Sequence, residues 1–378
     1  MRPRPIVAAC VLAAASLVLA ALLIDGELDP QESIFHTQAQ TVLSGRTPLF
    51  FHAGGELWLQ PVPVYSNAAL QAVSIGPASG RIASALAGAA DVALVVLAGY
   101  AIAGTAWAGI AAGLVLMLTP GHWSLAVHGT DPIFPAPLIL LWLYFLLQFL
   151  KFDSARALAL SAIALGATVY AHPSGPLTAI FLWMLTVIVS RRRHRVRLLT
   201  ATLLFIAMWL PAAAWFYAHR DTYADTFGRW LILASHLRSP LDAFHAFVNP
   251  NTLGTRASLY WGFWDPSDLF FATADVPSAM LLFEAPLILA ALLRARQIPD
   301  RAAVIIAAAA LVVPIAGSTF GVPHYFPYAA AVLPLMALLA GLGFDQLVAL
   351  LTRRHTLEDE VAVAAVDGWD AEDLAPRG

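Results

Sequence analysis

The chain has 378 residues, 60% of them hydrophobic and 12% charged, and a mean hydropathy of +0.73. A soluble domain of this length does not carry so much apolar sequence, so the composition excludes a soluble enzyme and gives no reason to expect a nucleic-acid partner. The net charge of −3 is uninformative because it averages over two sides of a membrane. Cys10, the single cysteine, lies in the first apolar run, which excludes a disulfide framework and a cysteine-based metal site.

Apolar segments of roughly 17–25 residues are long enough to cross a membrane as helices. Ten segments approach this length, near residues 5–24, 82–103, 106–119, 134–150, 157–171, 176–190, 198–218, 278–293, 302–319 and 325–350. We therefore expect an all-α polytopic membrane protein with about ten transmembrane helices, in one domain over residues 1–355. A cleaved signal peptide is the alternative for the first segment, although its apolar run is long and no clear small-residue cleavage site precedes Asp25.

The distribution of Lys and Arg predicts the sidedness, since short cytoplasmic loops carry an excess of both. With the N-terminus in the cytoplasm, 15 of the 21 Lys and Arg residues fall on the inner side and 6 on the outer side. Two long loops, 25–81 and 219–277, then face outward, and we expect short helices in the first of them. Residues 356–378 hold seven acidic residues and few large apolar ones, which predicts a disordered acidic cytoplasmic tail.

The first outer loop begins with acidic residues, of which Asp29 and Glu32 are three apart. If Pro30 opens a short helix, both acids lie at its first turn, where a rigid backbone holds a catalytic carboxylate well. The same spacing is typical of a capping arrangement, with Asp29 as N-cap and Glu32 three residues later. Asp131, directly before the fourth span, is likewise either an N-cap or a functional acid. The sequence leaves both interpretations open.

Cations are few on the outer side, and guanidinium groups suit phosphate because they form bidentate, charge-assisted hydrogen bonds. Arg46 follows the helix-like stretch 32–45, and Arg81 begins the second span. Anchoring at the membrane surface is the alternative role for each arginine.

Ionisable residues inside the spans indicate a different class of function. Asp91 and Glu284 are buried hydrogen-bonding residues or parts of a transport pathway. Four histidines map to short outer loops and would form a metal site only if the fold brings them together: His122, His128, His172 and His324. We expect no metal site or other cofactor from the sequence, and dependence on a divalent metal stays open.

Several motifs follow one another in a recognisable order. They are Gln31-Glu32-Ser33, Ala39, Gly45 to Pro48, Pro61-Val62-Pro63-Val64-Tyr65, Arg81 to Gly88, Pro120 leading to Asp131, and Pro323-His324-Tyr325 through Pro334-Leu335. On these motifs the chain resembles the GT-C superfamily of membrane glycosyltransferases, in the branch of protein mannosyltransferases and aminoarabinose transferases. The chain departs from the family pattern in two places. Gln31-Glu32 stands for the family's acidic pair, with Asp29 two residues upstream, and His324-Tyr325 stands for its Arg-Tyr.

The resemblance implies a GT-C-like enzyme in the plasma (inner) membrane that moves a sugar from a polyprenyl-phosphate carrier to an acceptor lipid, glycan or protein. It implies transfer on the extracytoplasmic face with inversion, and a general base in the first outer loop, Asp29 or Glu32. The implied donor-phosphate residues are Arg81, Arg46, His324 and Tyr325, and further candidates on the acceptor side are Asp131, His128 and Tyr65. The alternatives are a lipid or sugar transporter or flippase, and a non-catalytic GT-C-like assembly partner.

Overall fold

The computed structural model describes residues 5–24, 26–54, 58–73, 76–190, 195–219, 250–271, 278–319 and 326–372. Two predicted site residues, His324 and Tyr325, and much of the second outer loop lie outside these ranges.

Apolar helices occupy all ten predicted positions. They are α1 (Pro5–Leu23), α4 (Ser79–Ala103), α5 (Ala106–Leu118), α7 (Pro135–Phe152), α8 (Ala155–Ala167), α9 (Gly175–Ser190), α10 (Arg195–Ala207) with α11 (Leu210–Ala218), α16 (Glu284–Leu293), α17 (Ala302–Ser318) and α18 (Val332–Glu372). Within the described residues, six stretches are long and apolar enough to cross a membrane, and α5 with α6 (Pro120–Val127) makes a seventh if the bent pair is one span. The three remaining apolar helices, α8, α9 and α16, are shorter. The all-α polytopic class is confirmed.

The break between α5 and α6 follows directly from the sequence Thr119-Pro120. Proline disfavours helical geometry in the residue before it and cannot donate its own main-chain hydrogen bond. Thr119 is accordingly extended, with φ −65° and ψ 115°, and it ends α5 and begins α6. The two helices meet at a bend of 63°. The span predicted over 106–119 therefore ends in a sharp turn, and α6 packs against α4.

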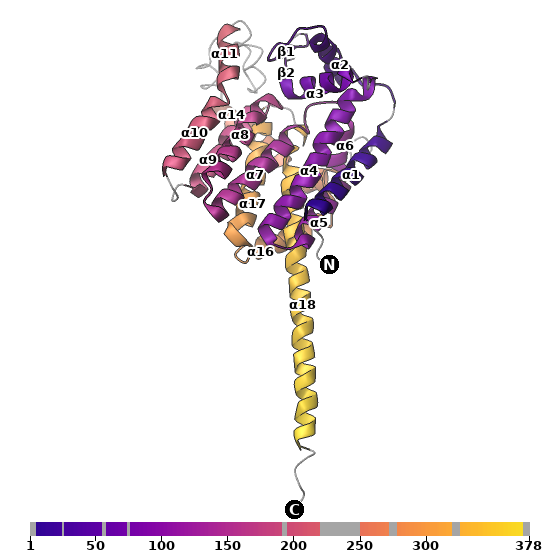
Figure 1. Cartoon of the computed structure of the whole chain (residues 1–378), viewed down its shortest axis with the longest axis vertical. Helices are drawn as coiled ribbons and strands as arrows, with labels where there is room; N and C mark the ends of the chain where they lie inside the picture. Colours follow the sequence, from indigo (N-terminus) through magenta and orange to yellow (C-terminus); the bar gives the residue numbers. More distant parts are fainter. Residues whose placement is uncertain are drawn as a thin grey trace, which may run out of the picture.

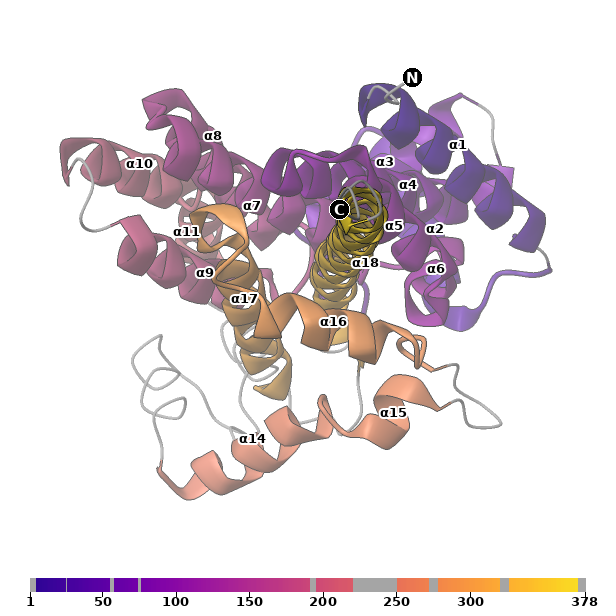
Figure 2. The same cartoon turned by 90° about the horizontal axis from the view of Figure 1, so that it is seen from below.

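The helices are layered around α4, α5, α17 and α18, as the view along the bundle in Figure 2 shows. The apolar stretches that contain α4 and α17 are 61% buried, whereas α1 and the α10–α11 pair are only 17% buried. Side chains such as Val11, Leu22 and Leu203 are exposed on these outer helices. Apolar side chains at such positions suit contact with lipid.

The first outer loop is an ordered layer over one end of the bundle. It contains α2 (Pro30–Leu43), a hairpin of β1 (Phe51–His52) and β2 (Trp58–Leu59), and α3 (Pro61–Ala72). Figure 1 places this layer at the end opposite the N-terminus and the far end of α18. The short helices match the prediction. The hairpin was not predicted, because strands of two residues give no alternating pattern.

The described part of the second outer loop forms α14 (Pro250–Gly262) and α15 (Pro266–Phe270). Short 3₁₀ segments complete the described structure: η1 (Gly76–Ala78), η2 (Thr168–Tyr170), η4 (Pro299–Arg301) and η5 (Phe326–Ala329).

The tail differs from its prediction. Helix α18 continues to Glu372, through most of the segment expected to be disordered, and projects away from the bundle in Figure 1. Ala, Leu and Glu are strong helix formers, so a helix already started in the membrane can extend through them.

Glycines allow the central helices to approach closely. A Cβ added to Gly343 of α18 would collide with the Leu287 carbonyl of α16, and one added to Gly109 of α5 would collide with the Val96 carbonyl of α4. Small residues at such crossings let helix backbones pack closely. In a membrane the hydrophobic effect does not drive helices together, so this close packing contributes much of their association.

We therefore expect Gly343→Ala to lower the melting temperature of the detergent-solubilised protein, because overpacking of this kind costs about 1–3 kcal/mol. Gly254→Ala is the matched control, since nothing lies within 4 Å of a Cβ there and alanine favours helix α14. Equal melting temperatures for the two variants would contradict this account of the α16–α18 contact.

Candidate functional site

Asp29 and Glu32 form a capping box at the start of α2. The Asp29 Oδ1 atom accepts the Glu32 main-chain N–H at 2.8 Å, and Glu32 Oε2 accepts the Asp29 N–H at 3.0 Å. Pro30 supplies the first helical residue, whose missing donor would be unpaired in any case. The capping arrangement that the spacing suggested is thus present. It fixes both carboxylates at the outer end of the bundle.

The Glu32 carboxylate pairs with Arg81, from the first turn of α4. Arg81 Nε donates to Oε1 at 2.9 Å and Nη2 donates to Oε2 at 2.6 Å. Glu32 is 2% exposed and Arg81 8%. Removal of one partner from a buried pair of this kind typically costs 3–5 kcal/mol, because the other charge stays buried. The pair therefore fastens the first outer loop to the second membrane span.

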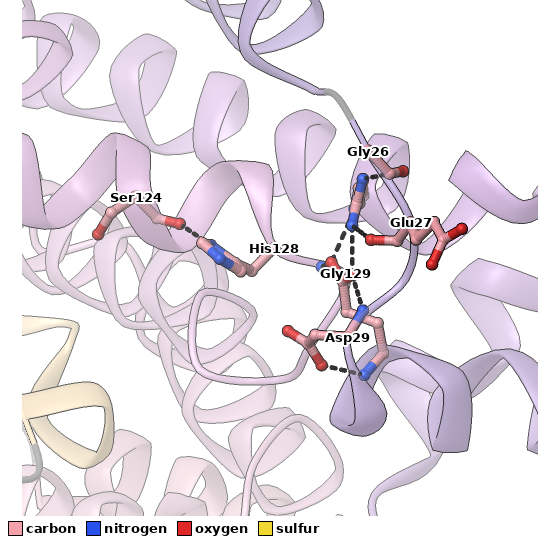
Figure 3. Close-up of polar contacts among 8 residues, drawn as sticks. Gly26, Glu27, Asp29, Ser124, His128 and Gly129 are labelled. Carbon is pink, nitrogen blue, oxygen red and sulfur yellow. Dashed lines mark hydrogen bonds and ion pairs between the residues drawn. The ribbon is translucent and has the colours of Figure 1, made fainter. Parts of the chain in front are cut away.

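A third segment completes the pair. The main-chain N–H of Gly129, just after α6, donates to Glu32 Oε1 at 2.7 Å. Figure 3 shows Gly129 close to Asp29, Gly26 and Glu27. A Cβ on Gly129 would lie 3.0 Å from the main-chain nitrogen of Arg81, so a larger residue would push this segment away from α4.

The electrostatics of Glu32 follow from these contacts. Burial alone would raise its pKa, but hydrogen bonds from Arg81 and from the main chain of Gly129 and Asp29 outweigh burial and lower the pKa below its ordinary value of 4.5. The carboxylate is therefore ionised at neutral pH. Four hydrogen bonds occupy its two oxygens, close to the limit of what a carboxylate accepts.

An open recess adjoins the pair, where α1 ends and α4 begins. It measures about 660 Å³ and is lined by Ile24, Gly26, Glu27, Leu28, Pro77, Ala78 and Arg81. Arg81 reaches the same wall, since Nη2 donates to the Glu27 carbonyl at 2.8 Å and Nη1 to the Gly26 carbonyl at 3.3 Å. The recess combines an apolar surface with a guanidinium and a carboxylate at the end of two membrane spans.

The other predicted site residues are more scattered. Arg46 is exposed beyond the end of α2. The Tyr65 hydroxyl donates to the Pro48 carbonyl at 2.9 Å, within the outer loop itself. His128 is exposed, and its Nδ1 donates to the Ser124 carbonyl at 2.6 Å. Asp131 lies near Gly129 in the chain, but α7 has Phe134 as its N-cap, so Asp131 is separated from that helix by a turn.

Two buried acids lie inside the bundle. Asp91 of α4 meets His122 of α6 at 3.5 Å, with both side chains at most 2% exposed. Glu284 of α16 accepts the Thr119 hydroxyl at 3.0 Å and the Leu281 N–H at 2.9 Å. Both contacts lie next to the α5–α6 break. The sequence alone did not predict that these side chains would meet there.

Within the described residues, three or more His, Cys, Asp or Glu side chains never gather in an arrangement suited to a metal ion. Of the four histidines considered, His122 and His172 are buried, His128 is exposed, and His324 lies outside the described residues.

Comparison with solved structures gives the fold a name. The crystal structure of ArnT from Cupriavidus metallidurans bound to undecaprenyl phosphate matches with a TM-score of 0.61 and 18% identity over 89% of this chain. The chain shares the fold of this ArnT structure. The apo structure of the same ArnT gives a TM-score of 0.59 at 18% identity, also over 89% of this chain. The chain spans 60% and 59% of the length of these two ArnT chains. No protein-family model and no curated protein sequence matches it.

Sequence reasoning missed the main-chain groups of the site. The ion pair is also hydrogen-bonded to main-chain groups, namely the N–H of Gly129 and the carbonyls of Gly26 and Glu27. Main-chain contacts of this kind cannot be predicted from the residue type. The glycine in His128-Gly129-Thr130 was a usable signal, because glycine allows close approach of two backbones.

The pH dependence of stability tests the pair. Because folding lowers the pKa of Glu32, its contribution is fully present above about pH 4.5 and is lost as pH falls through the folded value. The melting temperature of the wild type should therefore drop more steeply below pH 4.5 than that of Glu32→Gln. Glu27→Gln, which removes an exposed carboxylate from the same loop, should keep the wild-type slope. Parallel curves for wild type and Glu32→Gln would contradict the assignment.

Proposed function

We propose that the chain is a membrane glycosyltransferase. It takes a sugar from a polyprenyl-phosphate carrier and transfers it to an acceptor hydroxyl at the extracytoplasmic face. The observation that carries the proposal is the recess beside Arg81, in which an apolar surface, a guanidinium and nearby carboxylates meet at the ends of α1 and α4.

The recess has the features that a lipid phosphate requires. A prenyl chain can lie against the poorly buried α1 while its phosphate comes to the membrane surface. Arg81 lines the recess, and its guanidinium is the group that would form charge-assisted hydrogen bonds with a phosphate there. Glu32 offsets much of the Arg81 charge, which makes this a site for orientation more than for tight anion capture.

The shared fold supports the same donor class. One ArnT structure contains undecaprenyl phosphate, a polyprenyl phosphate. The excess of Lys and Arg in the loops on the other side of the membrane domain supports an extracytoplasmic position for the first outer loop. Nucleotide sugars are made in the cytoplasm, so a transferase on the outer face needs a donor carried by a lipid.

Asp29 is the general base in this proposal, and Glu32 positions it. Glu32 has a lowered pKa and four hydrogen bonds, whereas the described hydrogen bonds of the Asp29 carboxylate engage Oδ1. Asp29 removes the proton from the acceptor hydroxyl as that oxygen attacks the anomeric carbon. The bond from that carbon to the phosphate oxygen breaks, polyprenyl phosphate leaves with the electron pair, and the anomeric carbon is inverted.

The direct test is a transfer assay with the purified full chain in lipid nanodiscs. Polyprenyl phosphates carrying radiolabelled mannose, glucose or arabinose are incubated with an envelope extract of cells that lack the protein. We expect label from one of these donors to enter a covalent product only when the chain is present. Absence of transfer from every donor, with the protein intact, would remove the enzymatic proposal.

Asp29→Asn should lower the transfer rate by about 10²–10⁴-fold, the usual contribution of a positioned base. Asparagine is a good N-cap, so α2 and the melting temperature should be preserved. Asp268→Asn, a change to an acid in the short helix α15, is the control and should transfer normally. Near wild-type transfer by Asp29→Asn would show that Asp29 acts as a cap alone.

Arg81→Ala should weaken binding of polyprenyl phosphate by about tenfold to a hundredfold, since a hydrogen bond to a charged group contributes about 1.5–3 kcal/mol. Glu32→Gln separates this effect from loss of the ion pair, because it keeps the guanidinium and removes the opposing charge. Lipid binding to Glu32→Gln should be equal to or tighter than that of the wild type. Equal weakening in both variants would mean that the pair maintains the fold and does not contact the donor.

One observation favours a second function, movement of a lipid or sugar without chemistry. Buried Asp91, His122 and Glu284 surround the broken α5–α6 pair, and discontinuous helices with buried charges are common in transporters. Proteoliposomes that move the lipid-linked sugar across the bilayer without a covalent product would support this function over transfer.

A further inference from the structure

A second hollow lies at the same end of the bundle, where the β1–β2 hairpin faces α11 in Figure 1. It is lined by Phe50, Trp58, Gln60, Val169, Pro176, Trp215 and Phe216. These residues come from the first outer loop and from the outer ends of the helices near α8, α9 and α11. The hollow is small, about 40 Å³, which gives room for one edge of a single ring and excludes an oligosaccharide.

Aromatic rings form most of its wall and are held at fixed angles to one another. Trp215 meets Phe50 edge-on at 5.0 Å and Trp58 edge-on at 5.1 Å, while Phe216 stacks on Phe50 at 5.7 Å. Such pairs prefer edge-to-face or offset geometry, so each ring restrains the next. The wall is therefore a rigid apolar surface joined across two distant parts of the chain.

Two buried polar atoms interrupt this wall, Trp58 Nε1 and Gln60 Oε1. Gln60 stands directly before α3, is 9% exposed, and its Oε1 atom is buried with no hydrogen-bond partner in the structure. It does not cap α3 with its side chain. A buried amide oxygen without a donor is unfavourable, so a ligand that donates a hydrogen bond there gains more than it would at the surface.

We propose that this hollow receives one edge of a pyranose ring, the rest of which lies outside it. A sugar presents C–H faces that pack on aromatic rings and hydroxyl groups that donate hydrogen bonds, and the hollow offers a partner for each. A prenyl chain would leave Gln60 Oε1 without a donor. The proposal rests on the proposed transferase function only in the source of the sugar, which is either the lipid-linked donor or the acceptor.

The experiment measures binding instead of transfer, with the full chain in nanodiscs. One arm compares the affinity for polyprenyl phosphate with that for the same lipid carrying mannose, glucose or arabinose. The other arm measures saturation-transfer NMR signals of the corresponding methyl glycosides in the presence of the bare lipid. The variants are Gln60→Leu, which keeps most of the side-chain volume, and Trp58→Phe, which keeps an aromatic ring. Gln40→Leu on the exposed face of α2 and Trp107→Phe, 60% exposed on α5, are the matched controls.

Gln60→Leu should weaken binding of the sugar-bearing ligand by about three- to tenfold, the effect of one neutral hydrogen bond, and leave the bare lipid unaffected. An effect confined to the lipid-linked sugars assigns the ring to the donor, and one confined to the methyl glycosides assigns it to the acceptor. No effect of Gln60→Leu in either arm overturns the proposal. Loss of bare-lipid affinity in Gln60→Leu or Trp58→Phe also overturns it, because the hollow would then hold the prenyl chain. Failure of the wild type to bind any polyprenyl phosphate counts against the transferase function, and the methyl glycosides still test the hollow.

Discussion

The buried ion pair of Glu32 and Arg81 is the interaction on which the outer layer of this protein depends. A buried charge is tolerated only when its polar atoms have hydrogen-bond or ion-pair partners. Here three separate segments of the chain supply these partners. The first outer loop brings the carboxylate, α4 brings the guanidinium, and the turn after α6 brings a main-chain donor. Because none of these groups is stable there alone, the pair determines where the loop lies on the membrane domain.

That structural duty limits the chemistry open to the same residues. A carboxylate whose oxygens already accept four hydrogen bonds is a weak base, and a guanidinium paired with it attracts phosphate less than a lone one would. The site therefore divides its tasks. Glu32 and Arg81 supply a fixed frame, Arg81 also lines the recess, and Asp29 at the cap carries the reactive carboxylate in our proposal.

The sequence predicted best those features that depend on residues close together in the chain. Apolar runs predicted the positions of the apolar helices that the described residues form, and Asp29-Pro30 with Glu32 predicted both the start of α2 and its capping box. The sequence did not predict contacts between residues that are far apart in the chain. Glu32 and Arg81 are 49 residues apart and Glu32 and Gly129 are 97 apart, so no spacing rule could join them. The resemblance to glycosyltransferases pointed to both side chains without revealing that they pair.

Helix α6 links the membrane interior to this frame. The hydroxyl of Thr119, its N-cap, donates to buried Glu284, and His122 in its first turn lies 3.5 Å from buried Asp91. The chain beyond its last turn carries the N–H that binds Glu32. Helix α6 is eight residues long, so the contacts at its start and the Gly129 N–H beyond its end are separated by about two helical turns. The proline that breaks α5 from α6 makes this possible, since an unbroken span would end away from Glu32. The bend therefore helps to bring the segment that follows α6 to the Glu32 carboxylate.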